Sequence, residues 1–491
     1  MKDKRLPRRD FLKLGAVAAT AGSLPFSLSG CAPTGGGPHD EPTPPPTRPT
    51  LNPDEHDNAT AVTFSPESVP ADETTFSLGV SAGAMRDTSL VLWSHTSDNT
   101  PKTLRVWRAG RAAGEVMLAH EETLTPNDGG YLKTRVDGLA PDTRYFYAFF
   151  VGGNGAFTAR SEIGQVKTAY PDDWKWPITV AATTCTNQQY APFKALQLTA
   201  REELDALIHL GDMVYADGSA TIEEYREHWR TTLADPGYRA LLPTTGMYIT
   251  WDDHEFDNNL NPETLSASRM AAAKDAYFES LPNERGEDGR VWTSYRWGHT
   301  AELILLDCRT ERKPSTLETE QTYLSREQME WFKQTLKDSP CHFKVVLNSV
   351  PMCQMPEPWW ALPGDRWQGY THAREEILQF IEQNGVQNVW FLSGDFHLGF
   401  IGRLEREGFR RTMWDVAVGP GGNLGNPLAG LAEQSFENKE NIFPEAQFVY
   451  GKGRLCMTLL TLDPLRDVVR IKYVDAETEE VLFDRELSRH I

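Results

Sequence analysis

The sequence predicts an α/β protein, in which a layered αββα domain follows a small all-β domain of immunoglobulin or fibronectin type. Three features of the chain predict this. Short β-type runs fill residues 62–168, apolar runs alternate with amphipathic helical segments from about residue 175, and β-type runs return after residue 397. Two sheets that bury one face against each other, with helices on the outer faces, fit this order.

Residues 1–30 have the composition of an export signal, with a basic start, an apolar middle and small residues before Cys31. Arg8-Arg9 and the "FLK" that follows resemble a twin-arginine signal, and the apolar run is too short and too rich in Ala and Gly for a membrane span. "LSGC" resembles a lipobox, so we expect Cys31 to become a lipidated N-terminus. The alternative is an ordinary cleaved signal with a chance cysteine. The sequence thus predicts the twin-arginine translocase as an export partner and a lipid anchor on the periplasmic or cell-surface side of a membrane.

The rest of the chain divides into three predicted parts. Residues 31–61 are rich in Pro, Gly and polar side chains and predict a disordered tether. Residues 62–170 are the predicted N-terminal β-sandwich, and residues 171–491 are the predicted α/β domain.

Charge and cysteine content exclude some classes of function. The 491 residues carry a net charge of −20, and the signal carries six Lys/Arg and two Asp, so the chain after residue 30 carries −24. Such an acidic surface argues against a nucleic-acid partner. Five widely scattered cysteines remain after Cys31, which is not the pattern of a disulfide framework.

The all-β segment contains a serine motif whose context argues against catalysis. "TSLVLWSH", "TLRVWRA" and "RYFYAFFV" have the pattern of strands, and "GLAPDTRYFYAFFV" resembles a tyrosine corner. "GVSAG", residues 79–83, matches the nucleophile elbow of serine hydrolases, but that motif needs a helix after the serine and here a strand follows. We expect Ser81 to be a β-turn residue, with a serine esterase as the disfavoured alternative.

Polar residues end nearly every apolar run of the α/β segment. The runs are "PITVAATTC", "ALIHLGD", "MYITWDD", "AELILLDCR", "HFKVVLNS" and "NVWFLSGDFH". Carboxyl ends of neighbouring strands meet at one edge of an α/β sheet, where ligands bind. A single Asp there is often a helix cap or turn residue, but a whole ring of carboxylates repels itself unless cations are bound. The residues that we expect to converge are Cys185, Asp212, Asp252, Asp253, Asp307, Asn348 and Asp395.

Three further side chains next to these strand ends narrow the metal chemistry. Tyr215 follows Asp212 by three residues, His254 follows Asp253 directly, and His397 follows "SGD" by two. Thiolate, phenolate, imidazole and carboxylate together indicate a mixed transition-metal site. A hard ferric ion suits phenolate and carboxylate, and Zn²⁺, Mn²⁺ or Ca²⁺ could fill a second site. The segment "GPGGNLG", residues 419–425, does not fit a dinucleotide fingerprint and predicts a loop.

The motifs "GDMVYAD", "WDDHEFDNN", "LLDCR" and "SGDFH" resemble those of the PhoD-like phosphatases, a branch of the calcineurin-like metallophosphoesterases. "FSLGVSAGAM" and "GLAPDTRYFY" resemble the N-terminal domain of that family, so the resemblance spans about residues 64–485. It implies a metallophosphoesterase domain with a two-metal centre that hydrolyses phosphate esters.

The resemblance also implies roles for the converging residues. Asp212 would bridge two metals, and Cys185, Tyr215 and His397 would complete the first site, which would hold iron (Fe³⁺). Asp253, Asn348 and Asp395 would bind the second ion, where oxygen ligands favour Ca²⁺. Less secure positions, expected to lie around the ligands or to cap loops, are Asp252, Asp217 and Asp307.

The expected mechanism uses a metal-activated hydroxide that attacks phosphorus in line with the leaving oxygen. Arg309 is the candidate cation for the phosphoryl oxygens; the alternative is a surface arginine or an ion pair with Asp307. His254 is the candidate proton donor to the leaving group, or else a hydrogen-bonding histidine beside the metals. A non-catalytic metal-binding surface lipoprotein stays open as another class of function, and the sequence does not name the substrate.

Overall fold

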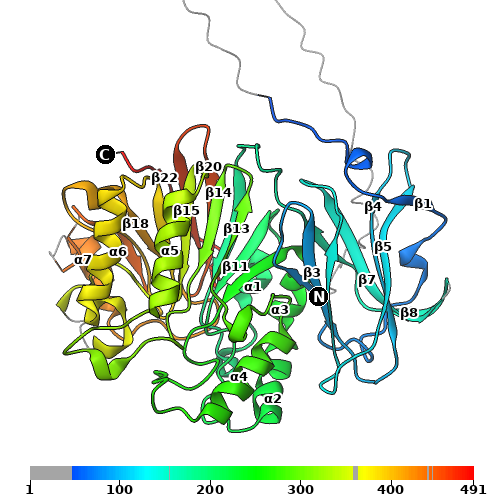
Figure 1. Cartoon of the computed structure of the whole chain (residues 1–491), viewed down its shortest axis with the longest axis horizontal. Helices are drawn as coiled ribbons and strands as arrows, with labels where there is room; N and C mark the ends of the chain where they lie inside the picture. Colours follow the sequence, from blue (N-terminus) through cyan, green and yellow to red (C-terminus); the bar gives the residue numbers. More distant parts are fainter. Residues whose placement is uncertain (1–46, 154, 358–362, 439–441, 445, 491) are drawn as a thin grey trace, which may run out of the picture. The chain divides into compact units, whose positions relative to one another are not determined.

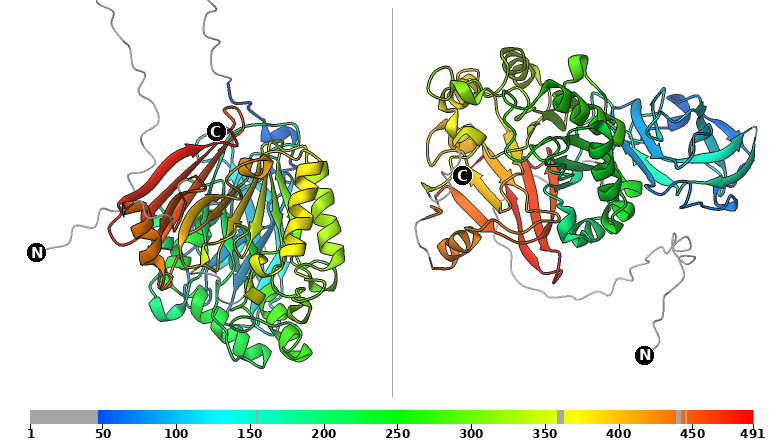
Figure 2. Two further views of the ribbon diagram at one scale, coloured as in Figure 1. Left: turned by 90° about the vertical axis from the view of Figure 1, so that its left-hand side faces the viewer. Right: turned by 90° about the horizontal axis from the view of Figure 1, so that it is seen from below.

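The computed structural model describes residues 47–490, except 154, 358–362, 439–441 and 445. The predicted signal peptide, the lipidation site Cys31 and the first part of the tether lie outside the described residues. Residues 1–48 and 49–491 form separate units, and the second unit contains all of the sheets. Its centre is a pair of mixed β-sheets with helices on their outer sides (Figures 1 and 2).

The first central sheet has nine strands in the order β22-β21-β20-β10-β11-β12-β2-β3-β6. Its strands β10, β11 and β12 are parallel, so they all end at the same edge. The pairs β10–β20, β20–β21, β21–β22, β2–β3 and β3–β6 are antiparallel. The bounds are β2 Val80–Gly83, β3 Ser89–His95, β6 Tyr131–Asp137, β10 Ile178–Thr183, β11 Ala206–Leu210, β12 Gly246–Thr250, β20 Cys456–Asp463, β21 Val468–Asp475 and β22 Val481–Leu487.

The second central sheet has seven strands in the order β13-β14-β15-β16-β18-β17-β19. Strands β14, β15, β16 and β18 are parallel, whereas β17 runs antiparallel to both of its neighbours. The bounds are β13 Thr293–Trp297, β14 Ala301–Leu305, β15 Phe343–Asn348, β16 Val389–Ser393, β17 Gly399–Arg403, β18 Trp414–Ala417 and β19 Phe448–Lys452.

Residue alternation along the strands builds three hydrophobic layers. Ile208 in β11 and Val345 in β15 belong to the core between the two sheets. Their neighbours Leu207 and Val346 point to the opposite faces and pack in the outer cores with the helices. In Figure 1, α5 and α6 lie over β15 and β18. The arrangement is therefore an αββα sandwich.

Two groups of helices cover the outer faces. Side chains of α1, α2, α3 and α4 share a core with the nine-stranded sheet, and those of α5, α6 and α7 share one with the seven-stranded sheet. Helix α2 begins with a capping box, in which Thr221 and Glu224 satisfy each other's backbone N–H groups. The bounds are α1 Lys194–Thr199, α2 Ile222–Leu233, α3 Pro236–Leu241, α4 Ala267–Ser280, α5 Arg326–Asp338, α6 Thr371–Gln383 and α7 Ala429–Asn438.

The strands of the N-terminal region lie in two sheets, one of which continues into the sheet of the following domain. A six-stranded sheet runs in the order β1-β5-β4-β7-β8, with β9 paired to β7. The strands that face it, β2, β3 and β6, belong to the nine-stranded sheet, which therefore continues across the predicted boundary between residues 170 and 171. The bounds are β1 Thr60–Val62, β4 Lys102–Ala109, β5 Val116–Leu124, β7 Arg144–Gly153, β8 Ala156–Arg160 and β9 Gly164–Lys167.

The predicted tether ends earlier than residue 61. Asp57 accepts bonds from the guanidinium of Arg108 at 2.8 and 2.9 Å and from the hydroxyl of Tyr145 at 2.7 Å, and its side chain is buried. Strand β1 also pairs with β5. The prediction of a disordered segment up to residue 61 is wrong here, because one buried ion pair ties a polar stretch to the sheet.

Ser81 lies inside β2, opposite Trp93 of β3, rather than in a β-turn as predicted. It is 2% exposed, and a strand rather than a helix follows it. A nucleophile elbow would present its hydroxyl at a sharp strand-to-helix turn. The buried strand position therefore speaks against the serine-esterase alternative.

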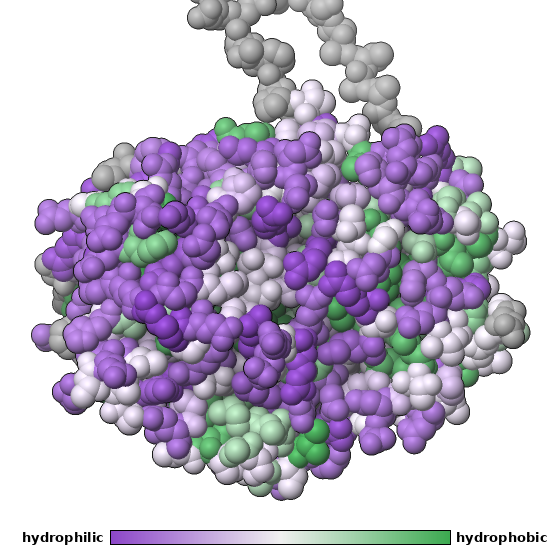
Figure 3. All heavy atoms as spheres, viewed as in Figure 1, coloured by the Kyte–Doolittle hydropathy of each residue, from purple (hydrophilic) through white to green (hydrophobic). Residues whose placement is uncertain are grey.

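The described residues have a largely hydrophilic surface and no disulfide bonds, as expected from the charge and cysteine content of the sequence. Figure 3 shows a largely hydrophilic face, and the exposed large hydrophobic residues are Tyr190, Leu424, Leu465 and Val481. Cys185, Cys308, Cys341, Cys353 and Cys456 are all buried with free thiols. Within the described ranges, every helix is too short or too polar to cross a bilayer.

Candidate metal centre

The predicted ligands lie in loops at the carboxyl ends of parallel strands from both central sheets. Cys185 follows β10, Asp212 follows β11, and Asp252 and Asp253 follow β12 in the first sheet; Asp395 follows β16 in the second. Within each sheet the parallel strands end at one edge, and the contact between Tyr215 and His397 shows that the two edges lie together. Sequence-distant side chains therefore meet there.

Four of the predicted ligands form one tight group, which we call the first cluster: Cys185, Asp212, Tyr215 and His397. The Cys185 Sγ atom and the Tyr215 hydroxyl each lie 3.3 Å from Oδ2 of Asp212, and the Tyr215 hydroxyl lies 3.4 Å from Nε2 of His397. Ligands at about 2.0–2.3 Å from a tetrahedral ion are roughly 3.3–3.8 Å apart. The donor atoms of the first cluster thus have the spacing of ligands around one ion.

The backbone is in an unusual conformation at these positions. Cys185 has φ 54°, Asp212 has φ 54°, Asp395 has φ 60° and His397 has φ 51°. Residues other than glycine rarely adopt positive φ, and such positions concentrate at functional sites, where the surrounding structure enforces them. The tight turns after β10, β11 and β16 therefore aim the ligand side chains inward.

Three more carboxylates form a second group around Arg309. Asp252, Asp253 and Asp395 lie close enough to share an ion. Arg309 is fully buried among them: its Nη2 lies 2.9 Å from Asp252, 2.7 Å from Asp395 and 3.4 Å from Asp253. Its Nη1 bonds Asp365, a residue of the loop after β15. This geometry excludes a surface position for Arg309. It favours the ion-paired alternative, but with these aspartates as partners instead of Asp307.

Asp212 and Asp253 connect the two groups. Oxygen atoms of both residues lie within reach of each other and of His254, and the backbone N–H of His254 donates to Oδ1 of Asp212 at 3.3 Å. One carboxylate oxygen of Asp212 therefore faces the first cluster, and the other faces the second group. A carboxylate in that position can bridge two ions.

Burial and mutual repulsion shift the pKa values of the ligands. Burial raises the pKa of the Cys185 thiol, the Asp212 carboxyl and the Tyr215 phenol well above their usual values. Burial also raises the pKa of Asp253, but the positive charges of Arg309 and His254 and the backbone hydrogen bond of Asn259 together outweigh it and lower that pKa to about 2. These groups bind a metal ion as thiolate, phenolate and carboxylate, so they must lose their protons first. A cation beside them would stabilise the deprotonated forms.

His254 lies at the rim of the site and is oriented by Asp217. Its Nδ1 atom is 2.8 and 2.9 Å from the two Asp217 carboxylate oxygens, and its ring stacks on Tyr215 with centroids 4.0 Å apart. Burial lowers the pKa of His254, but the negative charges of Asp212 and Asp253 and the Asp217 hydrogen bond raise it to about 10. Asp217 therefore holds the imidazole with Nε2 available for a further partner.

The structure does not bring Asn348 and Asp307 into either group. Oδ1 of Asn348 accepts hydrogen bonds from the Cys308 thiol at 2.9 Å and from the Trp367 indole at 3.0 Å. Asp307 accepts from the Trp251 indole and from backbone N–H groups of its own loop. Asp307 thus caps a loop, and the predicted ligand role of Asn348 stays a prediction.

Sequence reasoning missed Glu255 and Asp365. Glu255 is fully buried and accepts from the backbone N–H groups of Asp212 at 3.1 Å, Met213 at 2.7 Å and Asp252 at 2.9 Å. It therefore fixes the backbone of two ligand loops. Its place in "WDDHEFDNN" was a signal that could have found it, whereas Asp365 lies in a loop with no motif.

The donor set fits metal ions. Imidazole, thiolate, phenolate and carboxylate converge in the first cluster, which suits a transition metal, and carboxylate oxygens alone form the second group, which suits a harder ion. Asp252, Asp253 and Asp395 face the buried Arg309 and, at Asp395, the partly exposed Arg366, which do not balance all the charges of these residues and of Asp212. Metal cations would supply the missing positive charge.

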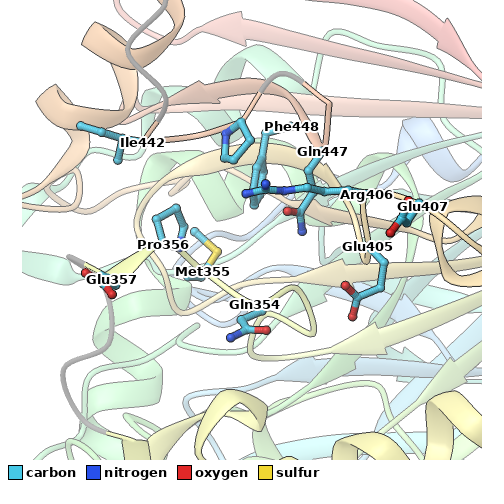
Figure 4. A pocket seen from close by; sticks show the side chains of 11 residues that line it. Gln354, Met355, Pro356, Glu357, Glu405, Arg406, Glu407, Ile442, Gln447 and Phe448 are labelled. Atoms are coloured by element: carbon cyan, nitrogen blue, oxygen red, sulfur yellow. The ribbon is translucent and has the colours of Figure 1, made fainter.

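A separate pocket lies at the other end of β17. It has a volume of about 560 Å³, and the lining residues labelled in Figure 4 belong to the segments after β15 and β17 and to the segment that leads into and begins β19. Strand β17 begins two residues after His397 and ends before this pocket, and five strand residues span about 16 Å. The pocket shares no lining residue with either ligand group.

Known proteins resemble this chain over the N-terminal β region and over the αββα domain. The sequence profile of the PhoD-like phosphatase family matches residues 180–432, and that of the PhoD-like phosphatase N-terminal domain matches residues 61–170. Alkaline phosphatase D of Bacillus subtilis (strain 168) is 27% identical over 396 residues, which cover 69% of this chain and 67% of that protein.

Two solved structures share the fold. The structure of PhoD has a TM-score of 0.70 and 20% identity, and the match covers 84% of this chain and 89% of that one. Purple acid phosphatase PPD1 from yellow lupin (Lupinus luteus) seeds has a TM-score of 0.60 and 13% identity over 84% of this chain and 73% of its own. The sandwich described above is thus the fold of these two structures.

Proposed function

Because the chain belongs to the PhoD-like phosphatase family, and is therefore a phosphoric ester hydrolase, we propose that it works through a two-metal centre built from the first cluster and the neighbouring carboxylates. The observation that carries this proposal is the convergence of Cys185, Tyr215 and His397 on Asp212, with ligand-like spacing. Its substrates are phosphate monoesters or diesters.

The residues present support two different ions. Cys185, Tyr215, His397 and Asp212 would hold iron as Fe³⁺, because phenolate and carboxylate are hard anionic ligands. The second ion would share Asp212 and take oxygen ligands from Asp253 and Asp395, with Asn348 as a further proposed ligand. Oxygen ligands alone favour Ca²⁺ at that position.

Bound metal ions supply positive charge that activates water as a nucleophile and stabilises charge on the phosphoryl oxygens. The chain's own groups contribute the rest. His254, held by Asp217 at 2.8 Å, presents Nε2 as a proton donor to the leaving oxygen of the ester. Arg309 holds Asp252 and Asp395 in place from within the protein, so it sets the position of the oxygen ligands.

Metal analysis together with a substrate panel tests this function. We expect the folded protein to contain iron and a second divalent ion, and to hydrolyse p-nitrophenyl phosphate, its bis-ester, or both. Asp212→Asn should lose both activity and metal while keeping its fold, because Asp212 serves both sites. Metal-replete protein that cleaves neither ester would refute the proposal, and full activity without iron would refute the assignment of the first site.

We also propose export by the twin-arginine route and a lipid anchor at Cys31. The motivation is the sequence of residues 1–31, with Arg8-Arg9 and "LSGC". Replacement of both arginines by lysine should retain the protein inside the cell, whereas Cys31→Ser should release it from the membrane fraction. A membrane-bound Cys31→Ser variant would rule out the lipid anchor.

A further inference from the structure

We propose that Asn423, in the glycine-rich loop of residues 419–425, is a positioning residue of the first cluster that holds the oxygen of Tyr215. The Nδ2 atom of Asn423 lies 2.6 Å from the Tyr215 hydroxyl oxygen and 3.3 Å from Nε2 of His397. The side chain is only 6% exposed. The mechanism proposed above gives this loop no role, and sequence reasoning identified it only as a loop.

The orientation of the Asn423 amide is fixed by its own neighbour. Oδ1 of Asn423 accepts a hydrogen bond from the backbone N–H of Leu424 at 2.7 Å. With the carbonyl oxygen occupied in this way, the NH₂ group must face Tyr215 and His397. Asn423 is therefore a donor toward the phenol oxygen, as required if Tyr215 acts as a phenolate, which can only accept hydrogen bonds.

The loop that carries Asn423 is bonded to the loop that carries Cys185. Gly421 N–H donates to Thr184 C=O at 2.8 Å, Gly422 N–H donates to Cys185 C=O at 3.1 Å, and Asn187 N–H donates to Gly422 C=O at 2.9 Å. These three bonds form a short ladder between the two loops. The backbone next to Asn423 is therefore attached to the Cys185 loop.

The glycines permit this close approach. A Cβ atom on Gly421 would lie 2.3 Å from Oγ1 of Thr183, and one on Gly422 would lie 2.2 Å from the Phe193 ring. Both distances are shorter than any non-bonded contact, so a larger residue would push the loop away from the Cys185 loop. The run of glycines is thus explained by packing, and the asparagine within it by its contact with Tyr215.

Asn423 consequently joins ligands that come from three separate loops. It touches Tyr215 from the β11 loop and His397 from the β16 loop, and its backbone is attached to the Cys185 loop. A hydrogen bond to a metal-bound phenolate also withdraws electron density from the oxygen. Outer-shell partners of this kind change metal affinity by about 10–100-fold when removed.

The test uses variants of the full-length protein and rests on the proposed iron in the first site. Asn423→Leu removes the donor and keeps the size, whereas Asn423→Asp keeps the shape and replaces the donor with an acceptor. Leu424→Ala is the matched control, since that side chain belongs to the same loop and is 62% exposed. For each protein we would record the visible absorption band of ferric phenolate, the metal content, and the rate of metal loss to a chelator.

We expect Asn423→Leu to move the absorption band to longer wavelength, because a phenolate without its hydrogen bond donates electrons to Fe³⁺ more readily. We also expect it to lose metal about tenfold faster than the parent. Asn423→Asp should retain the least metal, since its carboxylate repels the phenolate, and Leu424→Ala should match the parent.

The outcomes separate this inference from the proposed function. A parent protein without iron or the band would refute the ferric assignment, and metal loss would then test Asn423 with whichever ion is bound. The role of Asn423 would be overturned if the parent shows the ferric-phenolate absorption band and both Asn423 variants keep the same band and the same metal retention. The thermal unfolding midpoint of each variant shows whether the fold is kept. If Asn423→Leu does not fold, the isosteric Asn423→Asp alone decides the outcome.

Discussion

Replacement of Arg309 by methionine tests whether this residue holds the carboxylates together or contacts the substrate. Methionine has a similar length but carries no charge and no donor. Arg309 is fully buried and bonds Asp252, Asp365 and Asp395, with Asp253 at 3.4 Å. Its removal would leave Asp252 and Asp253 without a buried arginine, whereas Asp365 would keep Arg312 and Asp395 would keep Arg366.

The structure gives an expected magnitude. Breaking a buried ion pair by removing one partner costs about 3–5 kcal/mol, because the remaining charge stays buried. Arg366→Met is the matched control, since Arg366 also pairs with Asp395, at 3.2 Å, but its side chain is 17% exposed. Partly exposed pairs contribute about 1 kcal/mol or less. We therefore expect a destabilisation at least threefold larger for Arg309→Met than for Arg366→Met.

Urea unfolding of both variants, as purified and after EDTA treatment, measures this difference. Added Ca²⁺ should restore part of the stability of Arg309→Met, because a divalent ion can neutralise the same carboxylates. Inhibition by inorganic phosphate should be measured in parallel. If Arg309→Met unfolds within 1 kcal/mol of the parent but binds phosphate more weakly, Arg309 contacts the substrate and our reasoning is wrong.

Three further predictions concern other parts of the chain. Burial lowers the pKa of His209 to about 3, so between pH 3 and 6.5 the unfolded chain binds more protons than the folded one. The free energy of unfolding present above pH 6.5 should therefore fall by about 2 kcal/mol at pH 5. In urea unfolding, His209→Gln should remove that fall. An equal fall in the variant would contradict this. Asp217→Ala should lower kcat about tenfold, and Asp217→Asn less, because an amide oxygen can still accept from His254 Nδ1; unchanged kcat in the alanine variant would exclude this positioning role. Ser81→Ala should keep the full activity on phosphate esters. If this variant stays folded but loses the activity, a mechanism with Ser81 as nucleophile has to be considered again.

The main ligand positions were predictable because parallel strands end at one edge. Cys185, Asp212 and Asp395 each follow an apolar run directly, so the strand pattern alone brings them together. The strand pattern predicted that these residues converge, whereas the grouping of Cys185, Tyr215 and His397 around Asp212 followed from the family resemblance. The helices of the outer layers follow in the same way from amphipathic spacing.

Partners supplied by distant loops were not predictable. The oxygen of Asn348 is taken by Trp367, which lies 19 residues further along the chain, and Arg309 bonds Asp365, which lies 56 residues away. Neither loop has a periodic pattern that fixes its path. Asn423 was missed for the same reason, because its contact with Tyr215 depends on how closely two loops pack.

The pairing of β2 with β12 limits how this protein can be divided. Gly83 of β2 pairs with Met247 of β12, the strand that leads into Asp252 and Asp253. The Trp93 indole also donates to the carbonyl of Glu279 at the end of α4. A fragment starting at residue 171 would have β12 as a bare edge with unpaired N–H and C=O groups, which is a template for aggregation. The N-terminal strands thus cover this edge, and we expect residues 49–491 to fold as a single unit.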